Sequence, residues 1–232
     1  MRVAGLLLAA GAGRRLGMPK GLLTWAGTPL VVRGARLLTA GGCSPLAVTV
    51  GAAAEEVAAA LAGAGATDGG PPAVAPARVV RVDDWAEGMG ASLRAGLAAF
   101  TADHVDAVVV ALVDQPLVSP ALIRRLIGAA NTAAEGTDAE GAGERPRPAA
   151  IVAGYAGRPR TPVLLRREVW PDVAQLARGD VGARAWLRAN PDRVLQVPCE
   201  DVGSPDDIDT AADLTRLTAD TRLQLERREG PG

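Results

Sequence analysis

The chain has 232 residues, and we expect one large domain over residues 1–222. Its formal net charge of −1 gives no overall basic field for nucleic acid, and no apolar run approaches the roughly 20 residues of a membrane span. The two cysteines, Cys43 and Cys199, are too few for a disulfide framework. We therefore expect a cytoplasmic protein whose partners include neither nucleic acid nor a membrane.

The chain opens with an aliphatic run, VAGLLLAA, that imitates a secretory signal. The run is at the short limit of such segments, and dense basic residues follow it without a spacer. We interpret residues 3–9 instead as a buried strand that ends in a glycine-rich loop.

Strands and helices are predicted to alternate along the rest of the chain. Thr28-Pro29 supplies an N-cap and a first-turn proline for a helix to about residue 40, and Ser119-Pro120 does so for a later helix. Further helices are expected at 53–62, at 89–100, after Asp180 and from about 210. Further strands are expected at 46–50, 78–82, 107–112, from 150 and at 193–197, with an apolar segment around 162–165.

Three segments are expected to lie outside the regular elements. Residues 63–76 form a loop, residues 131–148 are a low-complexity mobile surface loop, and residues 223–232 are a flexible tail. Aromatic residues make up 3% of the chain, so Val, Leu, Ile and Ala must build the core. The alternation predicts an α/β fold of three layers around a mostly parallel sheet, and ligands of such sheets bind at the carboxyl ends of the strands.

The loop after the first strand, GAGRRLGMPK, carries a local excess of positive charge. No Asp or Glu precedes Glu55, and Lys20 is the only lysine of the chain. A compact ammonium can follow a phosphoryl group where the planar arginine fork cannot, which favours a functional role over a solvated loop residue. The phosphate loop of the Gly-Lys-Ser/Thr type is excluded because the order here is Pro-Lys-Gly. The dinucleotide fingerprint is excluded because the glycine spacing differs and the ribose-binding acid is absent.

Two other strands end at the same edge in residues that suit a phosphate ligand. Asp114 follows the aliphatic run of residues 107–112, where a carboxylate can bind a hard cation, although it can also cap the turn before Pro116. The segment EGMGASLRAG brings Ser92 and Arg94 to a helix start, where anions are favoured; an ordinary amphipathic helix with a solvated Arg94 is the alternative.

Five segments in chain order carry a family resemblance: LLLAAGAGRRLGMPK, DWAEGMGASLRAGL, ALVDQPLVSPALIRRLI, RGDVGAR and DIDTAADL. Together they resemble the molybdopterin nucleotidyltransferases, and most closely the molybdenum cofactor cytidylyltransferase branch. The resemblance implies a nucleotide-diphospho-sugar-transferase-like (Rossmann-like) α/β fold. It also implies transfer of a nucleotidyl group from a nucleoside triphosphate to a phosphate monoester, with release of pyrophosphate.

The resemblance also implies roles for individual residues. Backbone groups hold the base and ribose, Lys20 and Arg15 meet the triphosphate, and Asp114 with Asp209 bind Mg²⁺, the one cofactor expected. The expected nucleotide-binding residues are Leu8, Ala9, Ala10, Gly11, Gly13, Lys20, Asp84, Ser92 and Arg94. The only histidine, His104, is expected to be structural.

The sequence leaves alternatives open for the identity of the nucleotide and for that of the acceptor. The sequence AAG after the first strand resembles the cytidylyl branch, whereas guanylyl relatives usually show AGG; we expect CTP, with GTP as the alternative. Many relatives carry Gly-His-Pro where this chain has Arg160-Thr161-Pro162, on the side of the molybdopterin-type acceptor. A non-catalytic module that delivers nucleotide or pterin to a molybdenum hydroxylase is the other hypothesis.

Overall fold

The computed structural model describes residues 1–65, 76–135 and 147–228. They form a seven-stranded sheet in the order β5-β4-β1-β6-β8-β7-β9. Every neighbouring pair is parallel except the two pairs made by β8 with β6 and β7. The strands are β1 (Val3–Leu8), β4 (Leu46–Val50), β5 (Ala77–Arg81), β6 (Ala107–Leu112), β7 (Ala150–Tyr155), β8 (Arg158–Arg166) and β9 (Val194–Pro198).

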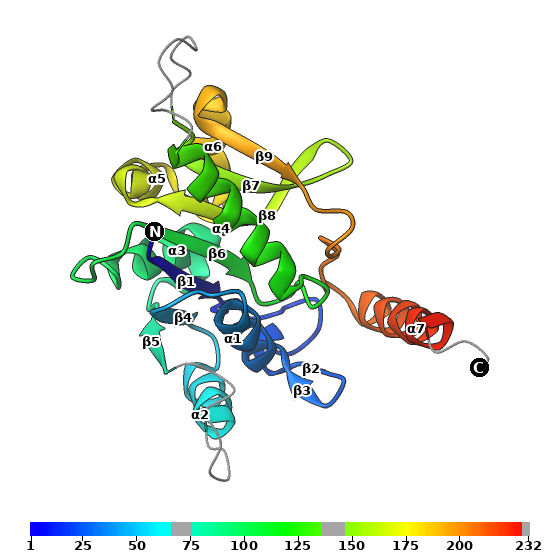
Figure 1. The fold of residues 1–232 in the computed structure, drawn as a ribbon. Helices are drawn as coiled ribbons and strands as arrows, with labels where there is room; N and C mark the ends of the chain where they lie inside the picture. The colour runs from blue at the N-terminus through cyan, green and yellow to red at the C-terminus, as the bar shows by residue number, and fades with distance from the viewer. Residues whose placement is uncertain (66–75, 136–146, 229–232) are drawn as a thin grey trace.

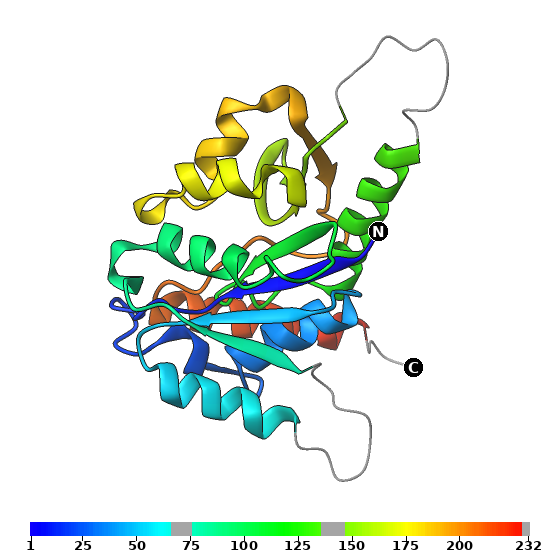
Figure 2. The same cartoon turned by 90° about the vertical axis from the view of Figure 1, so that its left-hand side faces the viewer.

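Helices cover both faces of this sheet, as the edge-on view of Figure 2 shows. Figure 1 labels α1 (Leu30–Ala40), α2 (Ala54–Gly65), α3 (Met89–Ala98), α4 (Pro120–Glu135), α5 (Trp170–Leu176), α6 (Arg184–Ala189) and α7 (Ala211–Arg228). The three-layer, mostly parallel fold expected from the sequence is confirmed. No helix in the described part of the chain is long and apolar enough to cross a membrane.

The core consists of aliphatic side chains that alternate between the two faces of the central strands. Val3 and Leu7 of β1 pack with α1, α2 and α4, whereas Leu6 and Leu8 pack with α3, α5 and α6. Strand β6 does the same through its successive valines. Both faces are buried, which explains why these strands read as continuous aliphatic runs.

Short elements complete the chain and correct one prediction. Thr28 does not cap α1: Thr28–Pro29 forms strand β3, antiparallel to β2 (Thr24–Trp25), and Pro29 occupies the N-cap position. The turn between them has Ala26 and Gly27 at positive φ, 48° and 76°. The 3₁₀ helices are η1 (Lys20–Leu22), η2 (Trp85–Glu87), η4 (Arg167–Val169), η5 (Gly179–Val181) and η6 (Pro191–Arg193).

The expected irregular segments are shorter than predicted. Helix α2 continues to Gly65 and α4 to Glu135, so each takes in the start of an expected loop; residues 66–75 and 136–146 lie outside the described residues. Helix α7 runs through Leu223 to Arg228, the region for which we expect a flexible tail. The apolar segment around residues 162–165 is part of β8, and α5 was not expected.

Candidate active site

Three chain segments meet where the central parallel strands end. Strand β1 leads into the glycine-rich loop, β6 leads to Asp114, and β5 leads through η2 into α3. They enclose a pocket of about 350 Å³. Its lining comprises Leu8, Ala10, Gly11, Ala12, Gly13, Arg14, Lys20, Trp85, Ala86, Gly88, Met89, Ser92, Leu112, Val113, Asp114 and Asp180.

This lining brings together seven residues expected at the site: Leu8, Ala10, Gly11, Gly13, Lys20, Ser92 and Asp114. Ala9 is buried directly beneath the loop, and its N–H donates to the Thr49 carbonyl of β4. The other expected residues, Arg15, Asp84, Arg94 and Asp209, do not line the pocket.

The glycine-rich loop folds back on itself at Gly13. This residue has φ +61°, and a Cβ there would lie 2.0 Å from the Met18 carbonyl oxygen. The Leu16 N–H donates to the Gly13 carbonyl across the turn. Only glycine satisfies both the conformation and the close approach, and the turn returns the chain so that Lys20 reaches the end of β6.

Lys20 lies between two carboxylates from distant parts of the sequence. Its Nζ is 2.7 Å from Asp114 Oδ2 and 2.5 Å from Asp209 Oδ1. Asp209 precedes α7, and the Arg15 guanidinium, which is largely exposed, lies 3.5 Å from its other oxygen. The structure therefore joins four of the residues to which the family resemblance gives a phosphate or metal role.

The charges in this cluster depend on one another. Burial raises the pKa of the Asp114 carboxyl, and the adjacent Lys20 ammonium opposes that rise without cancelling it. Burial alone would lower the pKa of Lys20, but the carboxylates of Asp114 and Asp209 together hold it above its usual value. Lys20 is thus fully protonated at neutral pH, a permanent cation at the edge of the pocket.

The carboxylates of Asp114 and Asp209 supply only some of the ligands that a hard cation needs. Among the described residues, no group of three or more His, Cys, Asp or Glu side chains is placed to hold a metal ion. Yet Asp114 and Asp209 lie close enough to share the Lys20 ammonium, and Asp114 Oδ1 is buried without a hydrogen-bond partner. Magnesium is commonly held by one or two carboxylates and completed by substrate phosphates, so these residues fit that mode of binding.

Arg94 and Asp84 face each other next to the pocket. Arg94 Nη2 lies 3.1 Å from Asp84 and 3.0 Å from Glu87, and its Nη1 donates to the Ala177 carbonyl. These bonds tie η2 to the end of α5. Arg94 is therefore not a solvated residue on an amphipathic helix, and in this structure its charge is already paired.

Asp180 is a pocket residue to which the sequence analysis gave no role. Its Oδ1 accepts a hydrogen bond from the Met89 N–H at the start of α3. Gly88, at φ +113°, lies so close that a Cβ would be 2.5 Å from the same oxygen. The motif RGDVGAR contains this aspartate, but no local pattern signals that η5 lies against α3.

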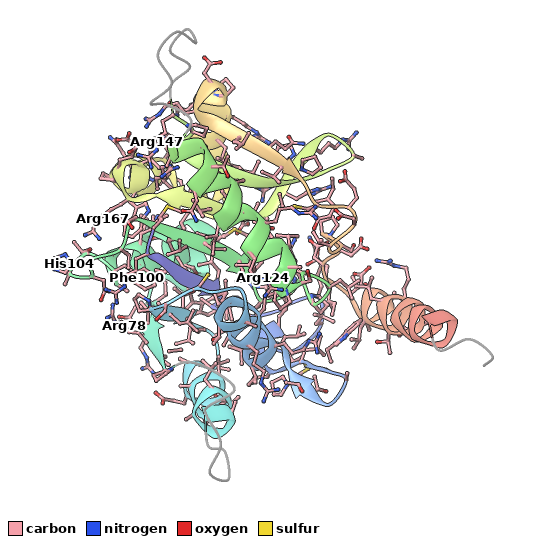
Figure 3. The ribbon with its side chains drawn as sticks, viewed as in Figure 1. Arg78, Phe100, His104, Arg124, Arg147 and Arg167 are labelled. Carbon is pink, nitrogen blue, oxygen red and sulfur yellow. The ribbon has the colours of Figure 1, made fainter. Side chains whose placement is uncertain are left out.

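His104 lies away from the pocket. It precedes β6 and so lies at the amino ends of the strands, near Arg78, Phe100 and Arg167 (Figure 3). The pocket lining contains neither histidine nor cysteine.

Residues 5–194 match the family model described as the MobA-like NTP transferase domain. The chain belongs to this family. The resemblance deduced from the sequence motifs is thereby confirmed, and the MobA-like chain is a nucleotidyltransferase by family.

Relatives of this MobA-like protein span nearly all of it. Nicotine blue oxidoreductase of Paenarthrobacter nicotinovorans is 36% identical over 217 residues, covering 93% of this chain and 96% of the relative. The crystal structure of Rv0371c from Mycobacterium tuberculosis H37Rv is 30% identical with a TM-score of 0.72, covering 94% and 98% of the two chains. That protein has also been solved in complex with manganese.

A more distant neighbour bears on the fold alone. The nucleotidyl transferase Mth528 from Methanothermobacter thermautotroptrophicus is 23% identical with a TM-score of 0.70, covering 97% of this chain and 99% of its own. This likeness confirms the α/β fold expected from the sequence.

Proposed function

We propose that this protein transfers CMP from CTP to the terminal phosphate of a molybdopterin-type cofactor and releases pyrophosphate. An oxygen of the acceptor phosphate attacks the α-phosphorus of CTP, and the bond from that phosphorus to the pyrophosphate oxygen breaks. The observation that carries the proposal is the Lys20–Asp114–Asp209 cluster at the edge of a pocket built on the glycine-rich loop.

The chemistry needs no nucleophile from the protein, because the acceptor brings its own. The protein's contribution is to align the two phosphates and to stabilise charge as it moves onto the leaving pyrophosphate. Backbone groups from Leu8 to Gly11 hold base and ribose in this scheme, and the Ser92 hydroxyl is a donor for a phosphate. Lys20, with Arg15 beside it, provides positive charge for the triphosphate.

Asp114 and Asp209 are the residues that would hold Mg²⁺, which neutralises phosphate charge when bound. The same two carboxylates accept hydrogen bonds from the Lys20 ammonium. The manganese complex of Rv0371c is consistent with a divalent metal in a relative that is 28% identical. The assignment of Mg²⁺ as the metal bound by this chain is part of the proposal.

The choice of CTP rests on the space around Ala10. This residue is buried and lines the pocket, its side chain packs with Val82 and Ala91, and its carbonyl accepts from the Ala52 N–H. A pyrimidine leaves room for the Ala10 methyl, whereas a purine favours glycine at this position. A guanylyltransferase of the same family is the alternative within this chemistry.

The experiment measures pyrophosphate release with molybdopterin cofactor, Mg²⁺ and each of the four ribonucleoside triphosphates in turn. We expect release with CTP that depends on the acceptor, and none from Asp114→Asn. Tight nucleotide binding without release would identify the non-catalytic delivery module instead.

The name of the Paenarthrobacter relative supplies a second candidate, an oxidoreductase acting on nicotine blue. A simple test of this candidate measures the oxidation of NADH or NADPH with a quinone-type dye as electron acceptor. Oxidation that survives in Asp114→Asn, without nucleotide transfer by the wild type, would favour that candidate.

A further inference from the structure

A second cavity, of about 250 Å³, lies under the opposite face of the sheet from the nucleotide pocket. It is bounded by α1 and by the segment that leads from β6 into α4. Helices α1 and α4 pack in the core layer opposite α3, which borders the nucleotide pocket. Leu112 and Val113 at the end of β6 contribute to the walls of both cavities.

Two arginines in the wall of this second cavity lack acidic partners. Arg33 and Arg36 lie three residues apart on α1, a spacing that puts both on one side of the helix. Neither forms a salt bridge within the described residues. Burial lowers the pKa of Arg33, and the positive charge of Arg36 lowers it further.

Arg33 also holds an unused hydrogen-bond donor. Its Nη2 donates to the Pro116 carbonyl at 3.3 Å, but its Nε is buried and has no partner. A buried donor without an acceptor is unfavourable, and buried polar groups are nearly always satisfied. The described protein therefore supplies no acceptor for the Nε–H of Arg33.

The start of α4 adds to the positive potential. Pro120, its first residue, lines the cavity, and the helix is 16 residues long. The amino end of a helix carries partial positive charge and attracts anions. No acidic residue belongs to the lining; the other polar side chain there, Gln115, is occupied by the Pro205 carbonyl and the Thr161 hydroxyl.

We infer that this cavity is a binding site for a small phosphate monoester, whose phosphate group bridges Arg33 and Arg36. A guanidinium offers parallel N–H donors that match phosphate oxygens, and the Nε–H of Arg33 is a donor that has no partner within the protein. The remaining walls, such as Leu37 and Val118, are apolar and suit a hydrophobic body on the ester. The volume falls below the 300–1,000 Å³ typical of drug-sized ligand pockets, which favours a ligand smaller than a nucleoside triphosphate.

The inference is independent of the proposed function, because it needs neither Lys20 nor the acidic pair. It is tested by the ¹H–¹⁵N signals of the arginine Nε–H groups in the intact labelled protein. Phenyl phosphate is titrated as the apolar-bodied monoester and inorganic phosphate as the bare anion, each against sodium chloride at matched ionic strength. Arg33→Gln and Arg36→Gln assign the two signals.

We expect the Arg33 Nε–H signal to move downfield and saturate with both phosphates, with phenyl phosphate binding several-fold more tightly. Arg36→Gln should weaken that binding at least fivefold, whereas Arg188→Gln on α6, which lines neither cavity, should not change it. A shift that chloride reproduces, or that never saturates, overturns the site. Equal affinity for the two phosphates overturns the monoester and leaves a bare phosphate site.

Discussion

Replacing Lys20 by methionine isolates the energetics of the buried cluster. The substitution keeps an unbranched apolar stem and removes the ammonium that contacts Asp114 and Asp209. The Asp209 side chain is 44% exposed and becomes solvated by water, whereas the Asp114 side chain, at 18%, gains much less solvation. Losing a hydrogen bond to a charged group costs about 1.5–3 kcal/mol, and an unpaired buried charge costs more. Since Asp114 retains some solvent, we expect a loss of about 2 kcal/mol at neutral pH, or about 4–8 °C in Tm.

The pH dependence of that loss identifies its source. Burial raises the pKa of Asp114, and Lys20 opposes this, so removing Lys20 raises the carboxyl pKa further. When the pKa of a carboxyl is higher in the folded than in the unfolded state, ionising that carboxyl costs more in the folded protein. The free energy of unfolding therefore falls as pH rises above the unfolded pKa. The stability of the variant should therefore fall, relative to wild type, as pH rises above about 4, the unfolded pKa.

Urea unfolding of both proteins across the range from about pH 4 to about pH 8 measures this difference, provided unfolding is two-state. The double variant Lys20→Met/Asp114→Asn is the matched control, because it removes the buried charge together with its partner. It should recover most of the loss at neutral pH. A loss that is independent of pH, or that persists in the double variant, would refute the reasoning.

Three further predictions concern catalysis. Asp114→Asn should lower turnover about 100-fold or more while the circular dichroism spectrum stays that of the wild type, because the charge that holds the metal is lost; near-wild-type turnover in Mg²⁺ would reduce Asp114 to a turn residue. Lys20→Arg should be clearly impaired in kcat despite its conserved charge, since the wider fork cannot follow a phosphoryl group; an unimpaired enzyme would make the lone lysine an accident of composition. Ala10→Gly should narrow the preference for CTP over GTP by about 1–3 kcal/mol at most, which is the value of one methyl in a pocket. Competition between CTP and GTP in one reaction measures this preference, and a wild type that already prefers GTP would contradict the steric argument.

The strands could be predicted closely because their signal is local. Residues 46–50 and 107–112 have the bounds expected from the sequence, since an aliphatic run buried on both faces ends where the chain leaves the sheet. The start of α1 shows the limit. Ser/Thr-Pro commonly opens a helix, but here the two-residue strands β2 and β3 pair first, and the turn places Ala26 at an unusual positive φ. The local preference of Thr-Pro for a helix start is overridden here, because tertiary contacts stabilise the hairpin of β2 and β3.

The site was predictable only in part, because charge partners come from far along the chain. Asp114 could be recognised at the end of a strand, but Asp209 lies 189 positions after Lys20, and only the family motifs indicated it. Asp180 and the Arg94–Asp84–Glu87 group were missed as contacts, since both depend on how α3 packs against η5 and α5. Chain periodicity carries no information on such packing.

The most direct test of nucleotidyl transfer follows the nucleotide itself. Purified protein is incubated with Mg²⁺, molybdopterin cofactor and CTP labelled at the α-phosphate, and the cofactor fraction is then isolated and its label counted. The account predicts that label enters the cofactor as CMP, in equal amount to the pyrophosphate released, and that Asp114→Asn transfers none. Label that remains in CTP, with a protein shown to bind CTP, would contradict the account.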